Sequence, residues 1–214
     1  MGWSQKNKTE DKRLKFKSLM KIIAGVDEVG RGSLIGPVYA AAVILNKSVN
    51  SKILKDSKTL TKEKREILFD YIKKNSIWAT GKATVEEIDK INILQASLLA
   101  MKRAIKKLKK KPSQVLIDGN KIPDLKNYNL RAIVKGDQKI PSISAASIIA
   151  KVTRDKFIKT LAKKNKGYNW DQNFGYGTNQ HLKAIKKLGV NKHHRKTFSP
   201  ISKLTNTISS YLKF

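Results

Sequence analysis

The first half of the chain alternates short apolar runs with amphipathic segments, a pattern that predicts three strands and two helices. The strand-like runs are 21–29, 36–45 and 76–85. Thr61 stands where the N-cap of a helix over 62–74 would be. A longer stretch, 92–110, has an apolar stripe at helical spacing and a basic end. A glycine-rich turn joins the first two runs, so we expect antiparallel strands at the start of the fold.

Beyond residue 110 the pattern changes to strands that alternate with helices. Short apolar runs at 114–118 and 130–135 are typical of buried strands, and apolar positions recur at helical spacing over 142–164. A glycine turn, a short helix and a basic segment follow. These elements predict an α/β fold: a mixed sheet flanked by helices, with a C-terminal helical region.

The length and charge of the chain suggest three parts. A length of 214 residues suits one domain with a small appendage. We divide the chain into a basic N-terminal arm over 1–20, a core over 21–165 and the C-terminal helical region over 166–214.

The charge of the chain indicates a polyanionic partner. Lys and Arg number 46 against 16 Asp and Glu, which gives a net charge of +30. Nucleic acid is the commonest polyanion that such proteins bind. A lysine-biased genome could account for part of the excess. Because 40% of the residues are hydrophobic, the chain can form a core, and a fully disordered basic protein is excluded.

The composition excludes several other classes. The chain has no cysteine, so it has no disulfides, thiolate zinc sites or cysteine nucleophiles. No apolar run approaches the length of a membrane span. The first 20 residues carry charges throughout and do not resemble a secretory signal. We therefore expect a cytoplasmic protein with no membrane partner.

Because acids are scarce, their positions are informative, and a small group lies where the apolar strands end. This group is Asp27, Glu28, Asp118 and Asp137. In open α/β sheets, sites form at the ends of strands. A single Asp in such a place is more often a turn residue or a helix cap, and Asp118 and Asp137 fit that interpretation as well.

Carboxylates that converge from neighbouring strands repel one another and are stable together only with a cation between them. Oxygen ligands suit Mg²⁺ or Mn²⁺, and two such ions can activate water and stabilise the leaving oxygen of a phosphodiester. An acidic pocket in a basic protein therefore suggests metal-dependent cleavage of nucleic acid. Adjacent strand residues point to opposite faces, so Asp27 and Glu28 share a site only if the strand ends or bulges there.

Several motifs occur in an order that resembles ribonuclease HII, over roughly residues 20 to 200. They are GVDEVGRGSLIGPV, DSKTL, INILQASLLAM, IDGNKIP, VKGD, SISAASIIAKVTRD, GYGT and HHRKTF. The resemblance implies a ribonuclease H-like fold with a C-terminal helical region that contacts substrate. It also implies an endonuclease that cuts on the 5′ side of ribonucleotides in duplexes, including a single one in DNA. The products would carry a 3′-hydroxyl and a 5′-phosphate.

The same resemblance implies roles for individual residues. It makes Asp27, Glu28, Asp118 and Asp137 the catalytic and metal-binding carboxylates, with Mg²⁺ or Mn²⁺ in a two-metal mechanism. The implied substrate contacts are Gly30, Arg31, Gly32, Ser57, Lys58, Tyr176, His194 and Arg195. Glycines let backbone groups approach a ribose closely, and the 2′-hydroxyl is what distinguishes RNA from DNA. A plain strand turn, a core or rim aromatic and a solvated loop are the simpler interpretations of the glycines, Tyr176 and the Ser57–Lys58 pair.

Three further residues have weaker cases. Asp155 lies four residues after Lys151 on the expected helix, so an ion pair is the simpler account. A role in supporting the metal ligands is its alternative. We expect His181 and His193 to be surface residues rather than ligands.

The expected partners are RNA/DNA hybrids and ribonucleotide-containing duplex DNA, bound by a monomer. Two other functions remain open: a noncatalytic basic nucleic-acid-binding protein, and another nuclease of the same fold. The placement of the acids argues against a pure binder, which has no reason to gather carboxylates where phosphates dock.

Overall fold

A five-stranded mixed sheet forms the centre of the computed structural model, which describes residues 22–54 and 61–204. Its strands are β1 (Ile23–Val29), β2 (Val38–Leu45), β3 (Ser76–Ala83), β4 (Gln114–Asp118) and β5 (Leu130–Ile133). The order across the sheet is β3-β2-β1-β4-β5. β1, β2 and β3 pair antiparallel, whereas β4 is parallel to β1 and β5 to β4. This confirms the predicted mixed sheet.

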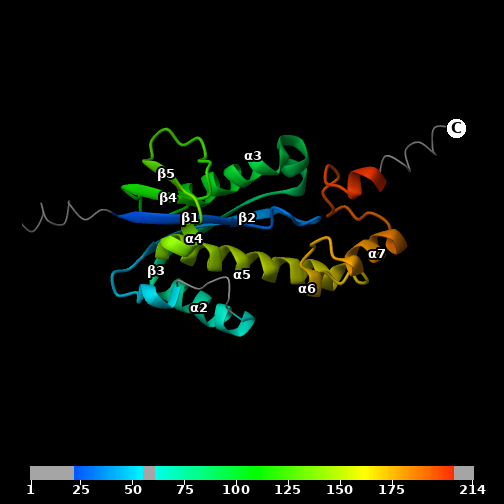
Figure 1. Cartoon of the computed structure of the whole chain (residues 1–214), viewed down its shortest axis with the longest axis horizontal. Helices are drawn as coiled ribbons and strands as arrows, with labels where there is room; N and C mark the ends of the chain where they lie inside the picture. The colour runs from blue at the N-terminus through cyan, green and yellow to red at the C-terminus, as the bar shows by residue number, and fades with distance from the viewer. Residues whose placement is uncertain (1–21, 55–60, 205–214) are drawn as a thin grey trace, which may run out of the picture.

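Helices cover both faces of the sheet. They are α2 (Lys62–Lys74), α3 (Val85–Lys106), α4 (Gly136–Lys139), α5 (Pro141–Lys164), α6 (Trp170–Asn173) and α7 (Asn179–Leu188), with a 3₁₀ turn η1 (Ser51–Leu54). α3 lies on one face, and α5 and α2 lie on the other (Figure 1). Alternate residues of β2 explain this arrangement: Ala40 and Ala42 join the core under α3, whereas Ala41 and Val43 join the core under α5.

Helix α5 lies unusually close to β1, and Gly25 makes this possible. A Cβ atom on Gly25 would overlap the backbone of Ser142 and Ile143 at the start of α5. The helix therefore runs directly beneath β1, toward the strand end that carries Asp27. This close packing places the polar side of α5 next to the acidic residues.

The start of α3 differs from the prediction for a local reason. α3 begins at Val85 rather than 92, because Thr84 and Glu87 form a capping box. Asn92 then interrupts the helix with a φ of 64°, and its Oδ1 accepts hydrogen bonds from the N–H groups of Leu94 and Gln95. The predicted start is thus the start of the second segment. α2 begins as predicted, with the Thr61 hydroxyl accepting from the N–H of Lys64 at 3.3 Å.

The C-terminal segment packs against the far end of α5 (Figure 1). Its core is formed by Leu34, Ile35, Ile158, Tyr168, Trp170, Ile185 and Ile201. Isolated bridges pair Ser33 with Tyr176 and Ile35 with His194, so the segment is tied to the turn that follows β1. Within the described residues, no helix is both long and apolar enough to cross a membrane. The predicted arm over 1–20 lies outside the described residues.

Candidate active site

The pairing of β1 with β4 brings two of the four acids to the same level of the sheet. Val26 pairs with Ile117 in the parallel register, so Asp27 and Asp118 are the next residues on adjacent strands. Both strands end near this point, with β1 running to Val29 and β4 ending at Asp118. Parallel strands that end together form the edge where α/β sheets hold their sites.

Asp27 is a buried carboxylate in an unfavourable electrostatic position. It is 6% exposed, and its Oδ1 accepts a hydrogen bond from the N–H of Glu28 at 2.7 Å. Burial raises the pKa of the Asp27 carboxyl well above its usual range, and the charges of Glu28 and Asp118 raise it further. A hydrogen bond with the Ser147 side chain on α5 opposes this rise only in part. The site would be stabilised by a positive charge.

Glu28 leaves β1 on the opposite face from Asp27. Asp27 pairs with Ala41 on the α5 side, whereas Glu28 pairs with Ala40 on the α3 side. The Glu28 Oε1 lies 3.2 Å from the Arg31 Nη1. Burial raises the pKa of Glu28, the Arg31 guanidinium offsets part of that rise, and the Asp118 charge adds to it. The charge of Asp118 therefore acts on the pKa of Glu28, although the Glu28 side chain leaves β1 on the opposite face of the sheet.

Asp118 positions the turn that carries Asp137. Its Oδ1 accepts hydrogen bonds from the backbone N–H groups of Gly136 at 2.7 Å and Asp137 at 3.4 Å. Lys135 adopts a left-handed conformation before α4, with a φ of 55°, and this ends the predicted strand at Ile133. The backbone contact leaves Asp137, which is 3% exposed, in the first turn of α4 beside Asp118.

The four acids fit a divalent cation in their donor chemistry. All donors are carboxylate oxygens, which suit Mg²⁺ or Mn²⁺. The raised pKa values of Asp27 and Glu28 reflect burial and repulsion that a cation would offset. No three His, Cys, Asp or Glu side chains within 22–54 and 61–204 are already grouped to hold an ion.

This balance of charge predicts how the fold responds to loss of Asp27. An Asp with a raised folded-state pKa stabilises the fold when protonated, and that stability is lost as the pH rises through the raised pKa. At neutral pH without divalent cations, Asp27→Asn should therefore raise the melting temperature, by roughly 2–4 °C for each kcal/mol of repulsion removed. Adding Mg²⁺ or Mn²⁺ should stabilise the wild type and have a smaller effect on the variant.

Thermal melts with EDTA and with each cation measure this effect. Asp124→Asn removes the same charge from an exposed loop and should leave the melting temperature unchanged. A lower melting temperature for Asp27→Asn in EDTA, or a wild type indifferent to both cations, would contradict the assignment.

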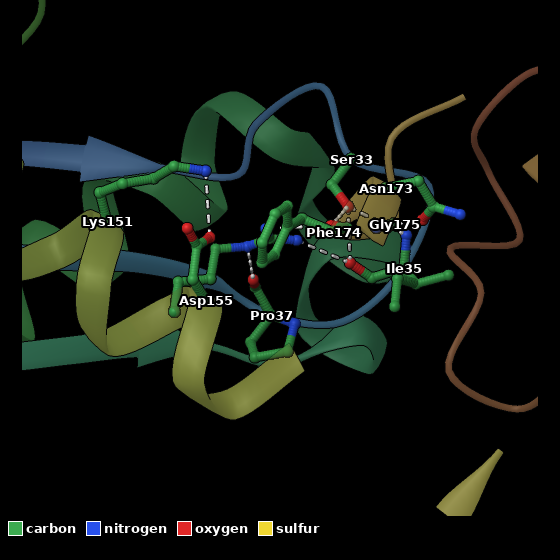
Figure 2. A network of polar contacts seen from close by, with 9 residues as sticks. Ser33, Ile35, Pro37, Lys151, Asp155, Asn173, Phe174 and Gly175 are labelled. Atoms are coloured by element: carbon green, nitrogen blue, oxygen red, sulfur yellow. Dashed lines mark hydrogen bonds and ion pairs between the residues drawn. The ribbon is translucent and has the colours of Figure 1, made fainter. Parts of the chain in front are cut away.

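Two buried arginines hold the segment that follows β1. Arg154 on α5 is fully buried, and its guanidinium donates to the carbonyl oxygens of Ile35, Pro37 and Phe174 at 3.2–3.3 Å. Figure 2 labels these three acceptor residues. The Ser33 hydroxyl joins this network, because the carbonyls of Ile35 at 3.1 Å and Phe174 at 3.3 Å are both acceptors within reach of its single proton. A side chain on Gly30, whose φ is 91°, would overlap Arg154. Glycine at this position therefore lets the turn lie directly against the arginine.

Arg195 holds the Gly30–Gly32 turn from the other side. Its guanidinium donates to the carbonyls of Gly30 at 2.7 Å, Arg31 at 2.8 Å and Gly36 at 3.0 Å. Burial lowers the pKa of Arg195 to about 9, so the guanidinium stays charged at neutral pH. Arg195 has no exposed surface. The expectation of a direct substrate contact is therefore revised: Arg195 fixes the peptide groups of the turn from beneath.

His194 and His181 lie in the interior of the C-terminal segment. Burial lowers the pKa of His194 to about 4, so it is neutral at physiological pH and brings no positive charge to a phosphate. His181 is also buried; its Nε2 accepts from the Trp170 indole N–H at 2.9 Å. The expectation of a surface position for His181 was wrong, because α7 turns this residue inward beside Ile185. His193 is half-buried.

Tyr176 lies beside the turn that follows β1. Its bridge with Ser33 connects it to the residue after Gly32. The Lys151 ammonium is 5.9 Å from the Tyr176 ring centroid and 5.0 Å from that of Phe174. Lys151 also forms the predicted ion pair with Asp155, at 3.0 Å (Figure 2). The Arg31 side chain is 52% exposed and forms its ion pair with Glu28.

Ser57 and Lys58 lie outside the described residues. The sequence reasoning missed Ser147, which bonds Asp27, and Arg154, which organises the turn. A signal for Arg154 existed: it stands between Ala150 and Ile158 at helical spacing on a buried stripe. An arginine in such a stripe indicates a buried polar contact.

The chain is similar to known proteins over most of its length. A family model described as ribonuclease HII matches residues 24–201. Ribonuclease HII of Pelagibacter ubique is 76% identical, over 86% of this chain and all of that protein. Ribonuclease HII of Roseobacter denitrificans is 49% identical, over 84% of this chain and 90% of that protein.

Solved structures share the fold. Ribonuclease H2 from Pyrococcus horikoshii superposes with a TM-score of 0.71 at 28% identity, covering 89% of this chain and 99% of that one. Ribonuclease HII of Archaeoglobus fulgidus, solved as a complex with PCNA, gives a TM-score of 0.66 at 25% identity, over 83% and 95% of the two chains. Bst-RNase HIII, solved in complex with Mn²⁺, gives a TM-score of 0.67 at 19% identity, over 88% of this chain and 70% of that one. At this identity the likeness is one of fold alone.

Proposed function

The chain belongs to the ribonuclease HII family and is a ribonuclease H of type 2, and from that premise we propose where and how it cuts. The proposed reaction is hydrolysis of the phosphodiester on the 5′ side of a ribonucleotide, leaving a 3′-hydroxyl and a 5′-phosphate. Its substrates are RNA/DNA hybrids and duplex DNA with single embedded ribonucleotides. The observation that carries the proposal is the register that places Asp27 and Asp118 together, next to the Gly30–Gly32 turn.

The proposed metal ligands are the carboxylates of Asp27, Glu28, Asp118 and Asp137. Bound Mg²⁺ or Mn²⁺, as a pair of ions, would supply an activated water and charge stabilisation at the leaving oxygen. The protein side chains hold the ligands in place. Ser147 orients Asp27, and Asp118 fixes the start of α4 through its backbone contacts. Arg31 forms an ion pair with Glu28.

The turn formed by Gly30, Arg31 and Gly32 is the proposed element that recognises the ribose. Arg195 binds two of its carbonyls, which fixes the directions of the peptide groups. A fixed backbone can hydrogen-bond a 2′-hydroxyl, which is both donor and acceptor. A Cβ on Gly32 would meet nothing within 4 Å, so this side of the turn has room for a sugar. Tyr176 would pack on the neighbouring sugar, and Ser57 and Lys58 would contact phosphate.

The wider assignment follows from this substrate. We propose that the protein acts as a monomer, in the cytoplasm, in the removal of ribonucleotides from DNA. In this scheme residues 21–165 supply the catalytic core and 166–214 the substrate-contacting region, with 1–20 as a basic arm.

Cleavage of an RNA/DNA hybrid tests the reaction class. With Mg²⁺ or Mn²⁺ the protein should cut the RNA strand of the hybrid and leave single-stranded RNA and an all-DNA duplex intact, and EDTA should stop the reaction. Equal cutting of the hybrid and the all-DNA duplex would indicate a nuclease that does not read the ribose.

A further inference from the structure

A groove with a cavity volume of about 640 Å³ runs beside the second half of α5. Its walls are the start of α2 at Lys62, the α5 residues Lys159 and Lys163, and the segment that includes Phe174. A small adjoining hollow shares Lys62, Lys159 and Phe174 with the groove and extends to Asp155. Asp155 forms an ion pair with Lys151, one turn earlier on α5.

The lining of these two hollows is mainly basic. Together they carry six Lys and Arg side chains against three Asp and Glu side chains. The basic residues are Lys62, Arg65, Lys156, Lys159, Lys163 and Lys166. Asp155, one of the three acids, is neutralised by its ion pair with Lys151. The lining of the two hollows therefore has an excess of positive charge.

Two of these lysines face each other at the groove wall. The pKa of Lys159 is lowered, first by its contact with the Lys62 side chain and then by partial desolvation and repulsion. Lys62 belongs to the start of α2 and Lys159 to α5, so different elements bring the two ammonium groups together. Like charges held close are stabilised by an anion between them.

We propose that this basic groove binds backbone phosphates of the substrate duplex at a distance from the cleaved bond. The inference rests on the proposed function. Lys159 and Lys163 lie 12 and 16 residues beyond Ser147 on the same helix. At about 1.5 Å per residue they are roughly 18–24 Å along the axis, a span of about five to seven base pairs at 3.4 Å each. Lysines four residues apart lie on the same face of a helix. Lys159 and Lys163 are spaced in this way, so they could contact phosphates that follow one another along a nucleic-acid strand.

The test combines a groove variant with duplexes of different length. The groove variant carries Lys159→Gln, Lys163→Gln and Lys166→Gln. The matched control carries Lys106→Gln, Lys107→Gln and Lys109→Gln at the end of α3, which covers the opposite face of the sheet. Each protein is assayed on a 30-base-pair DNA duplex with one central ribonucleotide, and on duplexes trimmed to three base pairs on one side or the other.

On the long duplex the groove variant should raise KM roughly tenfold with kcat unchanged, and lower the salt slope of binding by about 2–3. The control variant should do neither. On the duplex trimmed on the groove side, the groove variant and the wild type should have the same KM. Circular dichroism confirms that both variants are folded.

Equal losses in the two variants, or a loss that does not depend on duplex length, would overturn the proposal and assign the charge to a general surface field. Failure of the proposed function gives a different result, because the wild type would then nick none of the duplexes. If the wild type nicks the duplexes normally but the groove variant behaves like the control variant, only the proposal of phosphate binding in the groove is refuted.

Discussion

Asp118→Asn should abolish cleavage while leaving the fold and duplex binding intact. The asparagine oxygen can still accept from the N–H of Gly136, so the start of α4 keeps its position. What is lost is one negative charge beside Asp27. If the carboxylate holds a catalytic cation, losing it removes several kcal/mol of transition-state stabilisation, so we expect kcat to fall roughly 10³-fold or more.

Single-turnover cleavage and equilibrium binding of a ribonucleotide-containing duplex measure the two effects separately. Binding should hold or improve, because the removed charge repels phosphates. Asp124→Asn, on an exposed loop, is the matched control and should cleave normally. Turnover within a few-fold of the wild type for Asp118→Asn would remove Asp118 from the active site.

Arg195→Met should have the second-largest effect, on both stability and ribose recognition. The methionine fills similar space but leaves the carbonyls of Gly30, Arg31 and Gly36 without their donors. Buried acceptors that lose their partners cost about 1–3 kcal/mol each, so the free energy of unfolding should fall by about 3 kcal/mol or more. The preference for a ribonucleotide duplex over all-DNA should fall toward one, because the turn is no longer fixed.

Two controls separate this positioning role from a general loss of stability. Arg195→Lys keeps the charge and some of the hydrogen bonds, so it should fall between the wild type and Arg195→Met. Ile185→Ala creates a cavity in the same C-terminal core, at a cost of about 2–5 kcal/mol, without touching the turn. The Ile185→Ala variant should have a lower melting temperature than the wild type, yet keep the preference for a ribonucleotide duplex over all-DNA. Loss of that preference in Ile185→Ala would show that stability alone accounts for the effect.

Periodicity predicted the elements of the fold where local signals and packing agree. Thr61 caps α2 as expected, and the apolar run 36–45 contains β2, whose successive residues are buried in two different cores. The prediction failed where a single residue overrides the local pattern. Asn92 breaks α3 with a positive φ, and Lys135 turns the chain out of β5. Such residues are compatible with several conformations, and tertiary contacts select one of them.

The acidic half of the site was more predictable than the half that holds the turn. Carboxylates at the ends of apolar runs are rare in this chain, so their positions were informative. Arg195, in contrast, is one of many basic residues, and nothing in the composition separates it from surface lysines. For Arg154 the sequence offers only its position on an apolar helical stripe. Only the fold shows that both guanidinium groups are buried against backbone carbonyls.

The most direct test of the central claim is to map the nick in a DNA duplex that contains one ribonucleotide. With Mg²⁺ or Mn²⁺, the account predicts a single cut on the 5′ side of that residue, with a 3′-hydroxyl on the upstream product and a 5′-phosphate on the ribonucleotide. Replacing the ribonucleotide by its deoxy form, or adding EDTA, should abolish the cut. An intact duplex under both metals and several salt concentrations, or a cut at another position, would contradict the account.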